Sequence, residues 1–230
     1  MPELLERLRK LEAAAAADVM VAMGLTNQVL SPDLNPLGSA QIVGRALCAE
    51  GRVGAEPTAI ATFELDQAVT AGDVVIIASY GYRKGALIGE NMVTSMVQRG
   101  ATGFILDSGV RDASALAAGP VPVYCAYRSP ANGHRFWAYT SIGGSVTLPG
   151  IWDPVLIHSG DYILGDSDGV CVLPTTFAEQ IVANAEIHMR TEARIKVAIE
   201  SGVARDQATR DSQRLKHVVP VTTGAVAIDE

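Results

Sequence analysis

The feature that most constrains the fold is a strand, helix and strand pattern near the middle of the chain. Residues 73–78 form an apolar run of strand length, rich in β-branched side chains and bounded by turn formers. Residues 88–100 carry apolar side chains at helical spacing and end at a glycine, and residues 103–107 return to an apolar strand. This pattern predicts a βαβ unit with two parallel strands and a right-handed crossover.

Polar residues follow both strands of this unit. The first strand leads through a loop into a helix that begins Glu90-Asn91-Met92, and the second leads into Arg111-Asp112. Both loops leave the carboxyl edge of the sheet, where open α/β sheets bind ligands. The first amides of a helix favour anions, and an arginine fork binds a carboxylate, so Asn91, Met92 and Arg111 are candidate carboxylate-binding residues. Asp112 offers a hard oxygen to a divalent cation. The alternative is a solvated Arg-Asp turn, with Glu90 only complementing the helix dipole.

Length and composition predict one α/β domain. The chain has 230 residues and a mass of 24.1 kDa, enough to bury a large core, and no linker divides it. Hydrophobic residues make up 48% and aromatic residues 5% of the chain, which suits an α/β core better than an aromatic-rich binding sandwich. We expect a helix over residues 3–22 and a helical tail over residues 175–215, with a long helix running to about Glu200.

Charge and cysteine usage indicate the compartment and exclude some partners. The net charge is -7 and the pI about 5.1, so the clustered basic residues of a nucleic-acid-binding surface are not expected. Cys48, Cys125 and Cys171 lie in separate apolar runs, as buried thiols of a reducing compartment do. The sequence has neither a signal-peptide core at its start nor an apolar run of membrane-spanning length. We therefore expect a cytoplasmic protein that binds neither nucleic acid nor membranes.

Two segments near the expected pocket leave alternatives open. The loop over residues 79–89 is expected to form a wall of the pocket. Its Lys84 would permit a Schiff-base mechanism with a keto acid, but it lies beside Arg83 in a polar loop, which disfavours that mechanism. Residues 127–137 are polar and irregular, and we interpret them as a surface loop. The alternative is that they contribute specificity for the distal part of a substrate.

Two separated motifs resemble the RraA-like family. The first is Glu90 followed, after twenty residues, by Arg111-Asp112, with Gly-Ala-Thr-Gly-Phe-Ile-Leu-Asp-Ser-Gly-Val leading into the pair. The second, residues 159–174, is similar to the family's late Pro-Gly-Asp…Asp-x-Asp-Gly-Val…Pro signature, with Ser159 where the family often has proline. The family contains the metal-dependent 4-hydroxy-4-methyl-2-oxoglutarate/4-carboxy-4-hydroxy-2-oxoadipate aldolases and also regulators of ribonuclease activity.

The resemblance implies a fold, an assembly and an activity. The fold is the β/β/α swivelling-domain type, with the βαβ unit at its centre and a long C-terminal helix, over residues 1–230 as a single domain. The assembly is a homotrimer or homohexamer with sites between subunits. The activity is that of a metal-dependent carbon-carbon lyase of aromatic degradation, which cleaves a 4-hydroxy-2-oxo acid to pyruvate and a keto acid. Oxaloacetate decarboxylation would accompany it, because both reactions pass through the pyruvate enolate.

The resemblance also assigns a metal and a carboxylate site. Asp112 would bind Mg²⁺ or Mn²⁺, the cations that carboxylate and water ligands favour. This cation and Arg111 would stabilise the charge that develops on the 2-keto oxygen of the substrate. The backbone N–H groups of Asn91 and Met92 would hold the substrate carboxylate.

Two glutamates would have roles in this site, one as a base and one as the residue that holds a metal-bound water. Glu90 is the candidate base for the 4-hydroxyl proton, with a metal-bound water as the alternative. The family often has aspartate at the position of Glu90. Glu192, from the C-terminal region of a neighbouring subunit, is the best match to the family's glutamate that holds a metal-bound water, with Glu186 as the fallback.

Two other functions stay open. One is a non-catalytic, protein-binding regulator of a ribonuclease; in such regulators the residue after the arginine is not a metal-binding carboxylate, whereas this chain has Asp112. The other is a different lyase or hydrolase on the same scaffold, indicated by the unusual segment 127–152 with Trp137 and Trp152.

Overall fold

A computed structural model describes residues 2–54 and 59–221 of the chain. The helices are α1 Pro2–Leu8, α2 Ala13–Ala22, α3 Thr62–Ala68, α4 Glu90–Gln98, α5 Ala113–Ala118, α6 Ala178–Glu200 and α7 Arg205–Ser212, with 3-10 turns η1 Gly133–Arg135 and η2 Thr175–Phe177. The strands are β1 Asn35–Leu37, β2 Ile42–Val53, β3 Asp73–Ala78, β4 Ala86–Ile88, β5 Gly103–Val110, β6 Val123–Arg128, β7 Trp137–Ile142, β8 Ser145–Leu148, β9 Val155–His158, β10 Tyr162–Asp166 and β11 Gly169–Leu173.

The described strands form a nine-stranded sheet and a two-stranded sheet. The order in the large sheet is β1-β6-β5-β3-β2-β10-β11, with β4 also paired to β5 and β7 to β2. Its central strands β6, β5, β3 and β2 are parallel, and the outer pairings of β1, β10 and β11 are antiparallel. Val74 lies opposite Gly103 and Ile77 opposite Leu106, so β3, α4 and β5 form the βαβ unit that the sequence predicts.

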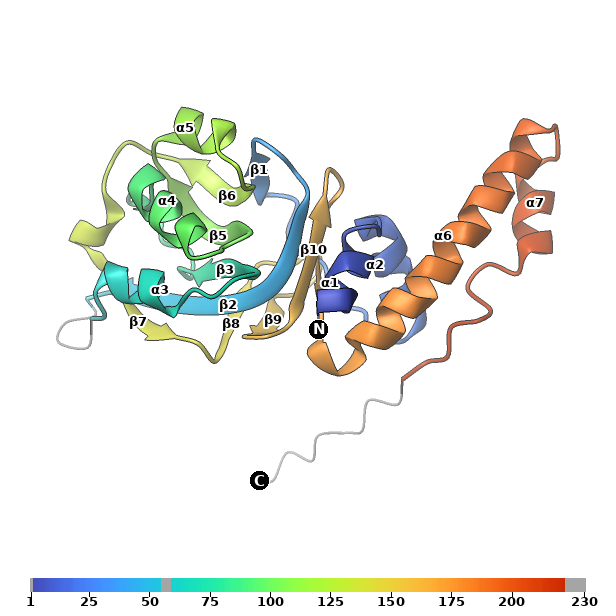
Figure 1. The fold of residues 1–230 in the computed structure, drawn as a ribbon, viewed down its shortest axis with the longest axis horizontal. Coiled ribbons are helices and arrows are strands. Elements are labelled where there is room, and N and C mark those ends of the chain that lie inside the picture. Colours follow the sequence, from blue (N-terminus) through green and yellow to red (C-terminus); the bar gives the residue numbers. More distant parts are fainter. Residues whose placement is uncertain (1, 55–58, 222–230) are drawn as a thin grey trace, which may run out of the picture.

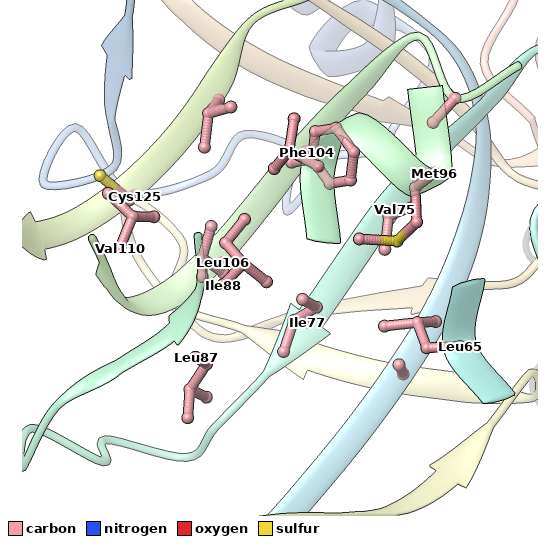
Figure 2. Close-up of a cluster of buried hydrophobic side chains, with 14 of the residues drawn as sticks. Leu65, Val75, Ile77, Leu87, Ile88, Met96, Phe104, Leu106, Val110 and Cys125 are labelled. Carbon is pink, nitrogen blue, oxygen red and sulfur yellow. The ribbon is translucent and has the colours of Figure 1, made fainter. Parts of the chain in front are cut away.

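The two faces of the central strands bury two different sets of side chains. Val75 and Ile77 of β3 face the cluster under α3, α4 and α5, which also contains Phe104 (Figure 2). Val74 and Ile76 face the other side, where β8 and β9 cover the sheet. Because successive side chains of a strand point to opposite faces, a strand covered on both sides must be apolar throughout. This explains the unbroken apolar run of β3.

The resulting layers are a two-stranded sheet, the large sheet and a row of helices. Figure 1 shows α3, α4 and α5 over one face and β8 and β9 over the other. This is the β/β/α arrangement that the resemblance implies. The carboxyl ends of β3 and β5 both lie near the start of α4. The candidate site lies at this edge of the sheet.

The N-terminal segment differs from the prediction of one helix over residues 3–22. The helix stops at Leu8, and a second one, α2, begins at Ala13. The amide of Ala13 donates to Asp166 Oδ2 at 2.8 Å, so the β10–β11 hairpin supplies an acceptor at the start of the second helix. The break allows apolar side chains of both helices to enter one cluster against α6 and β11. This tertiary contact is not visible in the local sequence pattern.

The C-terminal tail, expected to be helical over residues 175–215, contains η2, α6 and α7. The expected long helix ends at Glu200, as predicted. Figure 1 shows α6 packing beside α1 and α2 near its start and then extending away from the sheet, with α7 folded back along it. None of the described helices is long and apolar enough to cross a membrane.

The cysteines, two expected loops and the start of α3 can also be compared with the sequence predictions. The three cysteines are buried free thiols, as expected, and burial raises the pKa of Cys171 to about 12. Residues 24–40, with two prolines and several turn formers, predict a loop, and the structure has the short strand β1 there. The loop expected over residues 79–89 contains the short strand β4. The pattern of residues 58–68 predicts a helix; the helix in the structure begins at Thr62, and Thr58 itself lies outside the described residues.

Candidate active site

The candidate site lies where β4, β5 and the start of α4 meet. Strand β5 continues to Val110, beyond the predicted end at residue 107, because β4 pairs with it in parallel. Ile88 lies opposite Val110, and the amide of Arg111 donates to Ile88 O at 3.1 Å. This pairing brings Arg111 directly beside the residue that precedes α4.

Asp112 connects the two halves of the βαβ unit through its side chain. Its Oδ2 accepts a hydrogen bond from the amide of Glu90 at 3.1 Å and lies 3.7 Å from Arg111 Nε. The backbone of Asp112 has φ 56°, a left-handed conformation that aspartate and asparagine tolerate better than most residues. The conformation aims the carboxylate back at α4, although about half of the side chain remains open to solvent.

Gly89 leaves room for this arrangement. A Cβ atom at Gly89 would lie 2.7 Å from Asp112 Oδ2 and 2.9 Å from Arg111 Nε. Any larger residue would therefore displace the side chains of Arg111 and Asp112. The sequence pattern explains Gly89 as a loop residue, and the structure adds this close approach as its physical requirement.

The first turn of α4 presents free backbone amides. Gly89 is the N-cap and provides no side-chain cap. The amide of Glu90 is bonded to Asp112, and that of Val93 to Gly89 O at 3.1 Å. Within the described part of the chain, the amides of Asn91 and Met92 have no hydrogen-bond acceptor. They can bind an anion beside the Arg111 guanidinium.

A cavity of about 270 Å³ opens at this point. It is lined by residues of α3, β4, α4, the β5–α5 loop and η1: Thr62, Ala86, Leu87, Ile88, Gly89, Asn91, Met92, Arg111, Asn132 and His134. We call it the Arg111 cavity. It brings together three of the predicted binding residues, Asn91, Met92 and Arg111, and Asp112 lies at its edge against Gly89. The size suits a small molecule.

Glu90 and Glu192 lie outside the Arg111 cavity. The side chain of Glu90 lines the neighbouring groove between α4 and α5. Glu192 lies on α6 in a separate cavity of about 500 Å³, where it pairs with Arg214 and has His188 Nε2 at 3.8 Å. Figure 1 shows α6 on the opposite side of the molecule from α4, so Glu192 does not reach Arg111 within one subunit.

His134 is the main residue of the cavity that the sequence analysis did not identify. Its Nε2 lies 2.7 Å from Leu87 O, so Nε2 carries the hydrogen and donates to this carbonyl. Its ring packs edge-on against Trp137, with 5.7 Å between centroids, and 5.5 Å from Tyr139. Burial lowers the pKa of His134, and the nearby charge of Arg111 acts in the same direction, so the imidazole is neutral at pH 7.

The interpretation of residues 127–137 as a surface loop is therefore wrong for part of the segment. Strand β6 continues to Arg128, and η1 carries His134 into the cavity wall. The polar residues around His134 are typical of a surface loop, so nothing in the local sequence pattern marks its position in the cavity wall.

A divalent cation fits the site only as a hydrated ion. The described residues contain no group of three or more histidine, cysteine, aspartate or glutamate side chains that could enclose a metal. Asp112 offers an exposed carboxylate whose Oδ2 already accepts one hydrogen bond. Mg²⁺ keeps several water ligands and is often held by one or two carboxylates. The donor set therefore fits Mg²⁺ or Mn²⁺ better than Zn²⁺.

Together the fold and the site define a class of protein. It is a β/β/α-layered α/β domain with a small cavity, lined by one arginine, at the carboxyl edge of its parallel strands, as in α/β proteins that bind small ligands. The chain also matches the family model described as RraA-like, Aldolase/RraA, over residues 13–172. The chain belongs to the RraA-like family.

Relatives within this family carry different names. The chain is 30% identical over 165 residues to a Halalkalibacterium halodurans protein named "Putative 4-hydroxy-4-methyl-2-oxoglutarate aldolase", covering 71% of this chain and 73% of that protein. It is 27% identical over 217 residues to Protein DlpA of Legionella pneumophila, covering 92% of this chain but only 34% of DlpA. The chain therefore spans about a third of the length of DlpA.

A solved structure supports the same fold. Streptomyces coelicolor RraAS2, described as an unusual member of the RNase ES inhibitor RraA protein family, superposes with a TM-score of 0.73 at 25% identity. The match covers 84% of this chain and 96% of that chain. The swivelling β/β/α fold that the resemblance implies is thus the fold of this protein.

Proposed function

We propose that this protein is a divalent-metal-dependent lyase that cleaves a 4-hydroxy-2-oxo acid to pyruvate and a second oxo compound. The observation that carries the proposal is the position of the Asp112 carboxylate, which is held beside Arg111 by the amide of Glu90. An arginine and free helix amides then meet at one small cavity with the Asp112 carboxylate at its edge, and this supports a cation site there. The 30% identity to a relative named as an aldolase points to the same activity. We also propose that the protein decarboxylates oxaloacetate as a second activity.

The chain's own residues would bind and polarise the 2-oxo acid end of the substrate. The amides of Asn91 and Met92 and the fork of Arg111 hold the carboxylate, which fixes the adjacent keto group next to Asp112. A cation bound at Asp112 would supply Lewis-acid charge at the keto oxygen, where the enolate charge develops. Arg111 adds a second positive charge in the same position.

Two glutamates complete the proposal. Glu90 stays our candidate for the base that takes the 4-hydroxyl proton, and it would act through a water molecule because its side chain lines the neighbouring groove. Glu192 would come from a neighbouring subunit of a homotrimer or homohexamer and hold a water of the cation. Its distance from Arg111 within one chain is consistent with a role between subunits.

The experiment that tests the proposal is pyruvate formation by the purified protein. We expect release from at least one of 4-hydroxy-4-methyl-2-oxoglutarate, 4-hydroxy-2-oxopentanoate and oxaloacetate in the presence of Mg²⁺, and its loss after EDTA treatment. Restoration by added Mg²⁺ separates metal removal from damage to the protein. A folded, Mg²⁺-loaded protein that releases no pyruvate from any of the three compounds would contradict the proposal.

Mixing two inactive variants tests the role of Glu192. Arg111→Ala and Glu192→Ala subunits, exchanged in equal amounts, should regenerate native sites wherever an intact Arg111 meets an intact Glu192. In a ring with one site per interface this happens at about a quarter of the sites, one half times one half. Pyruvate release would recover to that fraction of the wild-type rate. Absence of recovery, with subunit exchange verified by native mass spectrometry, would exclude the role.

A protein-binding regulator of a ribonuclease is the second candidate. It is favoured by the similarity to RraAS2, which is described as a member of an RNase inhibitor family. Such a role would not require the Asp112 carboxylate or a divalent cation. Ribonuclease inhibition that is unchanged in an Asp112→Asn variant, together with absent pyruvate release, would favour this candidate.

A further inference from the structure

Glu192 belongs to a network of four side chains that joins α2, α6 and the segment after α7. Its Oε1 atom contacts Arg214 Nε and lies 3.8 Å from His188 Nε2. Asp18 of α2 binds the same two partners, because its Oδ2 accepts from Arg214 Nη2 and lies 3.3 Å from His188 Nε2. All four side chains line the cavity of about 500 Å³ on α6. We call them the Glu192 network.

The network holds one oxygen of the Glu192 carboxylate and leaves the other available. Oε1 is the atom that faces Arg214 and His188, and within the described residues Oε2 has no ion-pair partner. The side chain as a whole is 42% exposed. A glutamate side chain has several rotatable bonds, so without a partner its carboxylate would sample many positions. Contact at Oε1 gives Oε2 a defined place from which it can accept a hydrogen bond from outside the subunit.

The backbone beside Arg214 is strained. Gln213 has φ 51° and Leu215 has φ 61°, which are left-handed conformations that residues with a Cβ atom adopt only at a cost. A left-handed residue commonly ends a helix, so Gln213 is explained as the cap of α7. Leu215 has no such explanation. Strain of this kind is concentrated at functional sites, and here it lies next to the residue that contacts Glu192.

The segment after α7 does not depend on the Arg214 side chain for its attachment. Leu215 packs against the apolar cluster of α2 and α6, and the amide of Val221 donates to Met23 O at 2.9 Å. The ion pairs of Arg214 are partly exposed, and exposed ion pairs contribute little to folding. Stability therefore gives little reason for the two contacts of Arg214, and we expect the chain to fold when this side chain is replaced.

We infer that Arg214 is a positioning residue of the proposed site. It holds the Glu192 carboxylate so that Oε2 can bind the water of a cation at Asp112 of a neighbouring subunit. Asp18 supports this role, because it anchors Arg214 from α2. The inference rests on the proposed function and adds to it a second residue that acts across the interface. Arg214 itself touches neither the substrate nor the cation.

Metal affinity tests this role without measuring catalysis. The electron paramagnetic resonance signal of free Mn²⁺ reports how much Mn²⁺ the protein binds. Residues that hold the outer ligands of a metal typically account for about 10- to 100-fold in affinity. We therefore expect Arg214→Gln to raise the Kd for Mn²⁺ about tenfold. A folded Arg214→Gln protein with the wild-type Kd would overturn the inference.

Two further variants show whether Arg214 acts through Glu192. Arg210→Gln is the matched control and should leave the Kd unchanged, because Arg210 lies on α7 and pairs with Asp206 of the same helix at 2.8 Å. The double variant Arg214→Gln/Glu192→Gln should bind Mn²⁺ no more weakly than Glu192→Gln alone. Additive losses of affinity would show that Arg214 acts independently of Glu192 and would overturn the inference.

Mixed oligomers test the action across the interface. Arg214→Gln and Asp112→Asn subunits are exchanged in equal amounts, and exchange is verified by native mass spectrometry. In a ring with one site per interface, about a quarter of the sites then combine an intact Asp112 with an intact Arg214 of the neighbour. These sites should bind Mn²⁺ with the wild-type Kd. If Arg214 acts only within its own chain, every intact Asp112 accompanies a substituted Arg214, so the absence of such sites would overturn the inference.

The outcomes separate this inference from the proposed function. If Mn²⁺ affinity depends on Arg214 across the interface but no oxo acid is cleaved, the positioning role holds and the lyase activity does not. If pyruvate is released and Arg214→Gln keeps the wild-type Kd for Mn²⁺, the lyase activity holds and the inference is wrong. A folded wild-type protein that binds no Mn²⁺ would contradict both.

Discussion

An Asp112→Asn variant is expected to lose pyruvate release by about 1,000-fold in kcat, which corresponds to about 4 kcal/mol of transition-state stabilisation. The substitution removes the negative charge that would hold the cation and keeps the shape of the side chain. Asparagine tolerates the left-handed backbone at this position and can still accept the hydrogen bond from the amide of Glu90. Steady-state kinetics with Mg²⁺ measures the effect on the best substrate.

Asparagine is the informative replacement at this site because alanine would change two further properties besides the charge. Asp112→Ala would add backbone strain at φ 56° and remove the hydrogen bond to Glu90, as well as removing the charge. Asp168→Asn is the matched control, since Asp168 is an exposed aspartate in the β10–β11 turn. A kcat within about twofold of wild type in Asp112→Asn would show that the carboxylate charge is not used.

An Arg111→Lys variant is expected to lower kcat/KM by about 100-fold. Lysine keeps the positive charge but lacks the planar fork that binds a carboxylate through two parallel hydrogen bonds. The loss corresponds to about 2.7 kcal/mol and should appear partly in KM, because Arg111 would hold the substrate before and during the reaction. Substrate titration of the initial rate separates the two contributions.

The control for Arg111 lies on the neighbouring helix. Arg99→Lys changes an exposed arginine at the C-terminal end of α4, remote from the free amides at its start, and should leave kcat/KM unchanged. The thermal unfolding temperature of both variants should remain close to wild type because both side chains are exposed. An Arg111→Lys variant with wild-type kcat/KM would remove Arg111 from the carboxylate site.

The central βαβ unit and the positions of Arg111 and Asp112 could be predicted because they depend on local signals. Hydrophobic periodicity identifies β3, α4 and β5, and the rule that parallel strands share a carboxyl edge places the two loops together. The prediction could not include the continuation of β5 to Val110. That continuation depends on pairing with the three-residue strand β4, whose own sequence is too short to carry a period.

His134 could not be identified for a similar reason. It reaches the cavity through contacts between segments far apart in sequence, namely Gly85 against Gly133 and the ring nitrogen against Leu87 O. The helix break before Ala13 likewise depends on Asp166, which lies 153 residues further along the chain. For Glu90, the sequence places the residue correctly at the start of α4 but does not reveal that its side chain lines the groove beside α5.

The most direct measurement of the central claim is deuterium exchange into the methyl group of pyruvate, followed by proton NMR in D₂O. We expect the wild-type protein with Mg²⁺ to form the pyruvate enolate reversibly, so that the methyl signal disappears as deuterium replaces hydrogen. Exchange should fall to the uncatalysed rate with EDTA and in the Asp112→Asn variant. This readout does not depend on the distal part of the substrate. Uncatalysed exchange rates with the folded, Mg²⁺-loaded wild-type protein would contradict an enolate-stabilising site at Arg111 and Asp112.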